Sequence, residues 1–419
     1  MPDPRVHIAG NQNYACIQCG RCCRRFHVLL REDEVERLGQ IDWMESIQVT
    51  NDFVTRIQGK PYFRRTDSGA CVFLDEETGA CLMHRHIGFK RKALTCRGYP
   101  MNIASTYWGE VSVVARMDCP AVQRNVGPPI TSRRREIKGL VQELGTKGGF
   151  TREQMEGISR QSLECITRGC IEVVEQDNGL SPGSRAYALH LTCERLRALG
   201  STFLADTPTL QEVMPTVLKR ACEEGAARSA KQLGGFSRGL FREWLAAYCR
   251  RDEEMFAPTV FRRLRRSLEL ALLFFGGGNL RVLGWEHPDF PVRKAALFKR
   301  AGGDGPVGSS AEIWECYRRL LVSRLEAPQF FGVSYYGEPF FSGLRALVLS
   351  YPLVLAAARI QAASAQRLSL CVEDIHYAVG AIDHCLGRSP LLQFRLWRSV
   401  EEYFSGPRFP ALLNSLGWE

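Results

Sequence analysis

The stretch "YACIQCGRCCRR" (residues 14–25) carries four cysteines within eight positions: Cys16, Cys19, Cys22 and Cys23. Thiolates are soft, anionic ligands for zinc and iron, and two-residue spacing lets one loop present successive sulfurs to a single centre. Side chains diverge from one backbone unit at adjacent positions, so we expect Cys22 and Cys23 to play different roles. The stretch therefore predicts a metal site, and it leaves open whether the metal takes part in a reaction or holds the fold together.

Four more cysteines complete the first 120 residues: Cys71, Cys81, Cys96 and Cys119. Eight thiols can supply two four-ligand sites, or one such site with four cysteines left over, and the spacing leaves both arrangements open. The Cys-x2-Cys-x2-Cys run has the compact spacing of ferredoxin-like iron–sulfur loops, and a Cys-Pro pair such as Cys119-Pro120 closes bacterial ferredoxin runs. His84 and His86 beside Cys81 are further candidate ligands, although histidines in such places are more often surface or packing residues.

The composition is that of a globular protein, with 419 residues, 45% of them hydrophobic and 24% charged. The N-terminal "MPDPRVHIAG" lacks the charged and apolar segments of a signal peptide. The apolar run at Ala346–Ala358 is short for a membrane span and contains Ser350 and Pro352. We expect a cytoplasmic protein that is not bound to a membrane. Because the cytoplasm keeps thiols reduced, the sixteen cysteines indicate metal or redox chemistry rather than disulfides.

The net charge of +10 includes three short basic runs, at Arg133–Glu136, Phe261–Ser267 and Val292–Arg300. Clustered Lys and Arg can bind phosphates. These runs are more typical of solvated helix faces, and no RNA motif with interleaved aromatic residues accompanies them. We do not expect nucleic acid as a partner.

The uneven distribution of cysteines predicts two domains: a cysteine-cluster metal-binding domain at residues 1–130 and a helical domain at residues 131–419. Two prolines and a glycine in Val126–Ser132 mark the boundary. In the first domain, acidic residues open a short helix at Arg31–Gly39. The β-prone residues of Met101–Met117 predict a hairpin. The expected class is α+β: a small cysteine-rich α+β domain followed by a larger, mainly helical one.

Beyond residue 131, apolar residues recur at three- and four-residue spacing, which predicts helices. The predicted helical segments are 186–199, 241–251, 259–275, 311–326 and 372–386. The eight cysteines of this domain are isolated, and we expect them to be packing residues. They are Cys165, Cys170, Cys193, Cys222, Cys249, Cys316, Cys371 and Cys385.

The pattern CxxCxxCC at residues 16–23 is followed by "CVFLDEETGACLMH" (71–84) and "GFKRKALTCRGYP" (88–100). This order resembles the cysteine-cluster family described as zinc- or iron-chelating proteins. Members of that family carry C-x2-C-x2-C-C, then a C-x-F-L element, another cysteine, and a K-P-x2-C-x2-[FY]-P element.

In this sequence Cys71 opens the C-x-F-L element, Cys81 is the next cysteine, and Cys96 lies in the last element. Ala93 stands where the family commonly has proline, which removes some turn rigidity but no ligand. The resemblance covers residues 14–120. It implies a metal-binding function with these cysteines among the ligands.

A subset of the family has a long helical C-terminal part and is known as the flagellin lysine N-methylases. Residues 317–387 look similar to that part in the order of their helices. This second resemblance implies methyl transfer from S-adenosylmethionine to lysine amines of a flagellin-like protein, with a cysteine-bound cluster required.

The residues themselves do not confirm a methyltransferase. The glycines in Leu270–Glu286 follow an apolar run as in a cofactor-binding turn, but the end of a helix explains them equally well. The radical S-adenosylmethionine triplet C-x3-C-x2-C does not occur. Lysine deprotonation requires a base or a desolvated pocket. Conceivable contributors are Tyr335, Tyr336, Glu338, Asp374 and His376.

Three functions stay open: an iron–sulfur enzyme, most specifically a protein-lysine methyltransferase; a zinc-stapled interaction module; and an iron–sulfur redox carrier or sensor. The cofactor is accordingly an iron–sulfur cluster, of the [4Fe–4S] type, or zinc, with S-adenosylmethionine added in the first case. Basic residues beside the cysteines would offset thiolate charge under all three functions. They are Arg21, Arg24, Arg25, Lys90, Arg91, Lys92 and Arg97.

Overall fold

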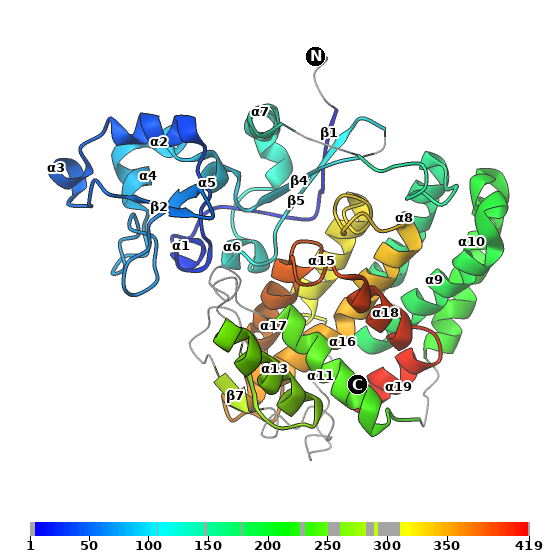
Figure 1. Cartoon of the computed structure of the whole chain (residues 1–419). Helices are drawn as coiled ribbons and strands as arrows, with labels where there is room; N and C mark the ends of the chain where they lie inside the picture. The colour runs from blue at the N-terminus through cyan, green and yellow to red at the C-terminus, as the bar shows by residue number, and fades with distance from the viewer. Residues whose placement is uncertain are drawn as a thin grey trace.

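A small lobe that contains strands precedes a larger bundle of helices (Figure 1), which confirms the predicted α+β class. The computed structural model describes residues 5–106, 108–145, 149–176, 179–226, 231–249, 260–281, 289–291 and 311–417. The basic run at Val292–Arg300 and the residue Glu286 lie outside the described residues.

The N-terminal elements are short. They are β1 (Val6–Ile8), α1 (Arg21–Arg25), α2 (Glu32–Gly39), α3 (Trp43–Ile47), β2 (Val54–Ile57), β3 (Lys60–Phe63), α4 (Leu82–Ile87), η1 (Phe89–Arg91), α5 (Leu94–Gly98), β4 (Met101–Ser105), β5 (Val111–Ala115), α6 (Pro120–Gln123) and η2 (Ile130–Arg133). The predicted helix is α2, and the Glu34 carboxylate accepts a hydrogen bond from the Arg31 backbone N–H at its start (3.0 Å).

The predicted hairpin is also confirmed. Strands β4 and β5 pair antiparallel, with Ile103 opposite Val113, and β1 adds parallel to β5 to give the order β1-β5-β4. Strands β2 and β3 form a second, separate hairpin. The cysteine-bearing segment between β3 and α4 forms turns and isolated bridges, such as Arg65 with Cys71 and Leu74 with Cys81.

The C-terminal part is built from helices and one short hairpin. The elements are α7 (Arg134–Leu144), α8 (Arg160–Glu175), α9 (Pro182–Ala205), α10 (Thr207–Gly225), α11 (Gly235–Tyr248), α13 (Val260–Phe274), β6 (Asn279–Arg281), β7 (Asp289–Pro291), α15 (Glu315–Glu326), α16 (Phe340–Ser364), α17 (Val372–Cys385), α18 (Arg395–Phe404) and α19 (Arg408–Leu416). The five predicted helical segments correspond to α9, α11, α13, α15 and α17.

Helix α16 runs through the core of the bundle, where it packs against α9 and α17. Because it is buried on nearly all sides, its sequence is apolar over most of its length and carries little helical period, so the periodicity of the sequence did not reveal it. By length and composition α16 is the one helix among the described residues that would suffice to cross a membrane. Its apolar window is 94% buried inside the fold, which is typical of a core helix.

Among the described residues, two large hydrophobic cores support the fold. The boundary between them does not fall at a single point of the sequence, because N-terminal strands belong to the core of the helical bundle. The first lies in the N-terminal lobe around four aromatic side chains, Trp43, Phe53, Phe63 and Phe73. The second fills the helical bundle, and β1 and β5 contribute Ile8 and Val113 to it. The three-stranded sheet is therefore packed against the helices, while the smaller lobe carries its own aromatic core (Figure 1).

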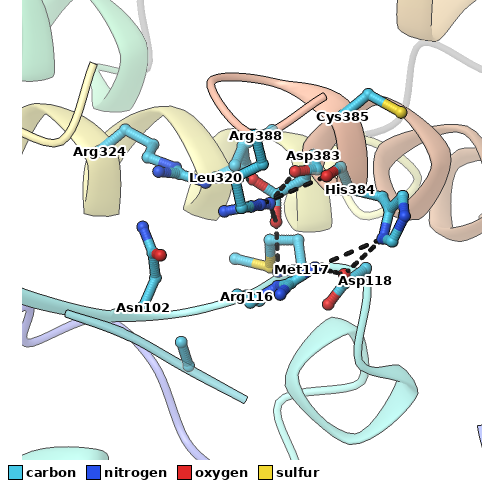
Figure 2. Close-up of polar contacts among 12 residues, drawn as sticks. Asn102, Arg116, Met117, Asp118, Leu320, Arg324, Asp383, His384, Cys385 and Arg388 are labelled. Carbon is cyan, nitrogen blue, oxygen red and sulfur yellow. Dashed lines mark hydrogen bonds and ion pairs between the residues drawn. The ribbon is translucent and has the colours of Figure 1, made fainter. Parts of the chain in front are cut away.

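A buried carboxylate joins the segment after β5 to the bundle (Figure 2). Asp383 on α17 is fully buried and accepts hydrogen bonds from the Arg324 guanidinium (2.5 Å) and from the Met117 backbone N–H (2.8 Å). Arg388 lies 3.3 Å from the same carboxylate. Burial alone would raise the pKa of Asp383, but the charges of Arg324 and Arg388 hold it below its usual value.

The residues that follow Met117 are hydrogen-bonded to helices α15 and α17. Arg319 on α15 donates hydrogen bonds to the carbonyls of Val122 (2.8 Å) and Gln123. The Gln123 amide in turn donates to the carbonyls of Met117 (2.6 Å) and His376 (2.8 Å). The chain from residue 117 to residue 123 is thus fixed on the bundle surface through buried polar contacts.

We predict that Asp383→Asn lowers the free energy of unfolding by about 3–5 kcal/mol, because it leaves buried arginine charge without its counterion. The matched control is Asp33→Asn, which breaks an exposed pair with Arg31 and should cost no more than about 1 kcal/mol. Urea unfolding followed by circular dichroism measures both. Equal, small losses in the two variants would contradict a structural role for the Asp383 contacts.

Candidate metal centre

All eight cysteines of the first 120 residues line two adjoining cavities, each of about 390 Å³. The first cavity is lined by Cys16, Cys19, Cys22, Cys23, Cys81 and Cys119. The second is lined by Cys22, Cys23, Cys71, Cys81 and Cys96. The structure therefore brings together the cysteines that the sequence analysis named, although they are spread over about a hundred residues.

The loop that carries Cys16 and Cys19 lines the first cavity, and two of its residues have positive φ. Gln18 has a φ of 51° and Gly20 one of 64°, and Gly20 stands at the start of α1. Gly79 faces this loop so closely that a Cβ placed on it would lie 2.2 Å from the Gln18 carbonyl oxygen. Cys16 and Cys19 stay exposed to solvent on this side of the cavity.

Cys119 also lines the first cavity, although it lies about a hundred residues after the loop that carries Cys16 and Cys19. It precedes α6, where Pro120 occupies the first helical position, as a proline can at a helix start. The position of Cys119 depends on the contacts of its neighbours: the Met117 N–H is bound to Asp383, and Asp118 is bound to Arg116 and to the His384 ring. The helical bundle thereby sets the place of one candidate ligand.

The second cavity lies against the aromatic core of the lobe. Its walls include Phe63, Phe73 and Met83 beside the thiols. Cys71 is buried and Cys96 is half-buried on α5. Cys81 stands at the start of α4, where its sulfur accepts a hydrogen bond from the His84 N–H (3.4 Å).

Cys22 and Cys23 lie on α1 in the wall shared by the two cavities, and their sulfurs are 3.9 Å apart. Contact with Cys23 and burial raise the pKa of the Cys22 thiol well above its usual value. Two thiolates this close repel each other, so both can ionise together only beside compensating positive charge. A bound metal supplies that charge.

Burial also raises the pKa of the other enclosed thiols. It moves the pKa of Cys71 to about 11 and that of Cys119 to about 12, although backbone N–H groups of α6 favour the Cys119 thiolate. The pKa of Cys96 is raised for the same reason. These thiols are protonated at neutral pH without a metal, so metal binding must release protons.

Seven basic residues were expected to offset the thiolate charge. Of these, only Lys92 lines the cavities, and it lines both. Burial would lower the pKa of its amine, but the thiolate charges of Cys81 and Cys96 raise it. Arg24 is instead paired with Glu76 on the surface, and Arg25 points to the backbone of the bundle. Arg85, which the sequence analysis did not name, also lines the first cavity.

The two candidate histidine ligands have different surroundings. His84 lines the first cavity, and burial lowers the pKa of its ring, which favours the neutral form that binds metals. His86 packs edge-on against Trp43, with 5.9 Å between ring centroids. Of these two histidines, only His84 therefore lines a cavity, while His27, which was not among the candidates, lines the second cavity.

The chemistry of the donor set fits a thiophilic metal, because eight sulfurs line the two adjoining cavities. Within the described residues, no three Cys, His, Asp or Glu side chains meet at the spacing of a single metal ion. The sulfurs instead stand around the walls of the two cavities. None of the sixteen cysteines, all of which are described, forms a disulfide.

The cysteines of the helical part lie apart from the two cavities, and five of them are buried packing residues as predicted, whereas Cys371 caps α17 and contacts Arg367 and Asp374. Cys170, Cys193, Cys249, Cys316 and Cys385 are buried, and the other three are half-buried.

The residues considered for lysine deprotonation do not form one site. Tyr335 is buried and donates a hydrogen bond to Glu401 (2.6 Å), whereas Asp374 is buried at the start of α17 and pairs with Arg367. Burial lowers the pKa of His376 to about 4. The glycines considered for cofactor binding follow the end of α13, where Gly276 has a φ of 80°, as at a helix terminus.

Residues 15–116 match the family model CxxCxxCC. This model is described as a "Putative zinc- or iron-chelating domain", and the match includes seven of the eight cavity cysteines. The eighth, Cys119, follows three residues after the matched segment. The chain thus carries a CxxCxxCC domain, and the match lends no support to the methylase resemblance of residues 317–387. No curated protein and no solved structure matches the chain.

We predict that Gly79→Ala lowers the metal content by at least half, because the new methyl group collides with the Gln18 carbonyl and displaces the cysteine loop. Gly59→Ala is the matched control. Gly59 has a similar φ of 77° but open space around it, so both variants carry the same backbone strain of about 1–2 kcal/mol. Elemental analysis of the purified variants measures the effect, and equal metal content in both would contradict it.

Proposed function

We propose that this chain is an iron–sulfur protein, with the cluster bound in the first cavity of the CxxCxxCC domain. Cys16, Cys19, Cys22 and Cys119 are the residues that would hold it. The observation that carries the proposal is that the Cys-x2-Cys-x2-Cys run and the remote Cys119-Pro120 pair line the same cavity. When bound, such a cluster supplies one-electron redox chemistry.

The arrangement of the sulfurs supports a cluster over a single zinc ion. Zinc draws its four ligands to within about 2.3 Å of one point. The described thiols instead surround a cavity of about 390 Å³, a space suited to a polynuclear core.

The exposure of this site favours a reactive role. Cys16 and Cys19 face solvent, so a cluster here would be accessible to an electron-transfer partner or to a substrate. Lys92 and Arg85 in the wall would offset the negative charge of the thiolates. A purely structural staple would gain nothing from such exposure.

Protein-lysine methylation is the finer proposal and rests on the sequence resemblance alone. It is tested by offering S-adenosylmethionine to the intact protein and measuring binding by calorimetry. Mass spectrometry then follows methylation of lysines on a flagellin-like protein. Binding together with methylated lysine would establish the methylase, and the absence of both would leave the redox carrier or sensor.

We predict that protein purified without oxygen is brown and contains iron and acid-labile sulfide. Cys19→Ser should lower both by at least half, because it removes a ligand of the first cavity. Cys165→Ser, which replaces a half-buried cysteine on α8, is the control and should leave both unchanged. Iron, zinc and sulfide are measured per chain. A colourless protein with stoichiometric zinc and no sulfide would contradict the proposal.

A further inference from the structure

We propose that Arg25 is the buried counter-charge of the metal centre and raises its reduction potential. This inference rests on the proposed function for the nature of that centre. It gives the junction between the lobe and the bundle a part in the chemistry of the cluster, beside its part in holding the two together.

The Arg25 side chain is buried without an ion pair. The residue is 7% exposed, although a guanidinium is always charged. Within the described residues its polar contacts are two long hydrogen bonds, to the carbonyls of Asp118 and Gly380 (3.5 Å each), and its Nε group has no partner. A buried charge is costly unless it is paired. The surroundings of Arg25 are therefore short of an anion.

Three further arginines at the same junction are paired, as Figure 2 shows. Arg324 and Arg388 share the carboxylate of Asp383. Arg116 pairs with Asp118. With the unpaired guanidinium of α1 included, four arginines face two aspartates. Positive charge is thus in excess where the lobe meets the bundle.

Arg25 is close to two ligands of the proposed cluster. It lies three residues after Cys22 on α1, and residues at this spacing share a face of a helix. Its guanidinium contacts the carbonyl of Asp118, which is the residue before Cys119. Both cysteines line the first cavity. The unpaired charge therefore lies behind two residues of the cavity wall.

A cluster held by four thiolates supplies the missing anion. The thiolates carry more charge than the iron–sulfur core, so the bound centre is negative, and a one-electron reduction adds a further negative charge. A fixed cation that is shielded from water stabilises the reduced form more than the oxidised form, which raises the reduction potential. Arg25 fits this role, because it is buried, always charged and paired with no carboxylate among the described residues.

The preceding residue on α1 provides a matched control. Arg24 is exposed, and its guanidinium pairs with Glu76 (2.6 Å). Water and this carboxylate screen its charge. The two arginines thus carry the same charge at adjacent positions of one helix, but only Arg25 is enclosed.

The test compares the reduction potential of the loaded full chain in the wild type, Arg25→Gln, Arg25→Lys and Arg24→Gln. Optical titration with dithionite, which supplies the electron, measures it. We expect Arg25→Gln to disfavour the reduced form about tenfold, which is about 59 mV for a one-electron couple. Arg25→Lys keeps the charge and should restore at least half of this shift, whereas Arg24→Gln should stay within about twofold of the wild type. Equal potentials in Arg25→Gln and Arg24→Gln would overturn the proposal.

A second measurement separates this role from a structural one. Urea unfolding of the metal-free full chain is compared for the wild type and Arg25→Gln. Because the variant removes an unpaired buried charge, its urea midpoint should be unchanged or higher. A variant that is less stable without metal, or that does not fold, would show that Arg25 serves the fold and would overturn the proposal.

The outcomes keep this inference apart from the proposed function. A colourless protein with zinc and no sulfide would overturn the proposed function. Zinc release to a chelator then tests the counter-charge, because a zinc tetrathiolate is also an anion. Arg25→Gln should release zinc at least about threefold faster than Arg24→Gln, and equal rates would overturn the counter-charge as well.

Discussion

The buried carboxylate of Asp383 is the contact on which the arrangement of the lobe and the bundle depends. A charge in the core is tolerated only when it is paired and hydrogen-bonded. Asp383 meets this requirement with Arg324 and Arg388 from the bundle and with the Met117 N–H from the segment after β5. The pairing therefore has a geometric consequence, since it fixes the residue two positions before Cys119.

A second set of contacts continues from this carboxylate towards the cavities. Asp118 accepts a hydrogen bond from the Tyr99 hydroxyl (3.1 Å) and contacts the His384 ring (3.0 Å), while Phe26 stacks on the same ring. Tyr99 lines both cavities. The bundle is thus in continuous contact with the thiol-lined lobe, so a change in the charge of a bound metal would act on groups that also touch α17.

The buried thiols differ from Asp383, because their surroundings do not stabilise the charged form. Burial favours their neutral form, and Lys92 is the single amine that lines both cavities among the described residues. Together with Arg85, which lines the first cavity, and Arg116, which lines the second, Lys92 supplies too few positive charges to balance eight thiolates. A thiophilic metal resolves the conflict, because it removes the protons and compensates the charge at the same time.

The sequence alone determined the α+β class, the hairpin at residues 101–117, helix α2 and five helices of the C-terminal part, and it singled out the eight cysteines that line the cavities, because spacing and periodicity are local properties of the chain. It did not reveal α16, whose uniform burial erases the helical period. Only the tertiary structure decided that Lys92 rather than Arg24 or Arg25 lines the cavities, and that His84 rather than His86 does. These outcomes depend on which segments meet in space, and side-chain direction and burial are set by such long-range packing rather than by neighbours in the sequence.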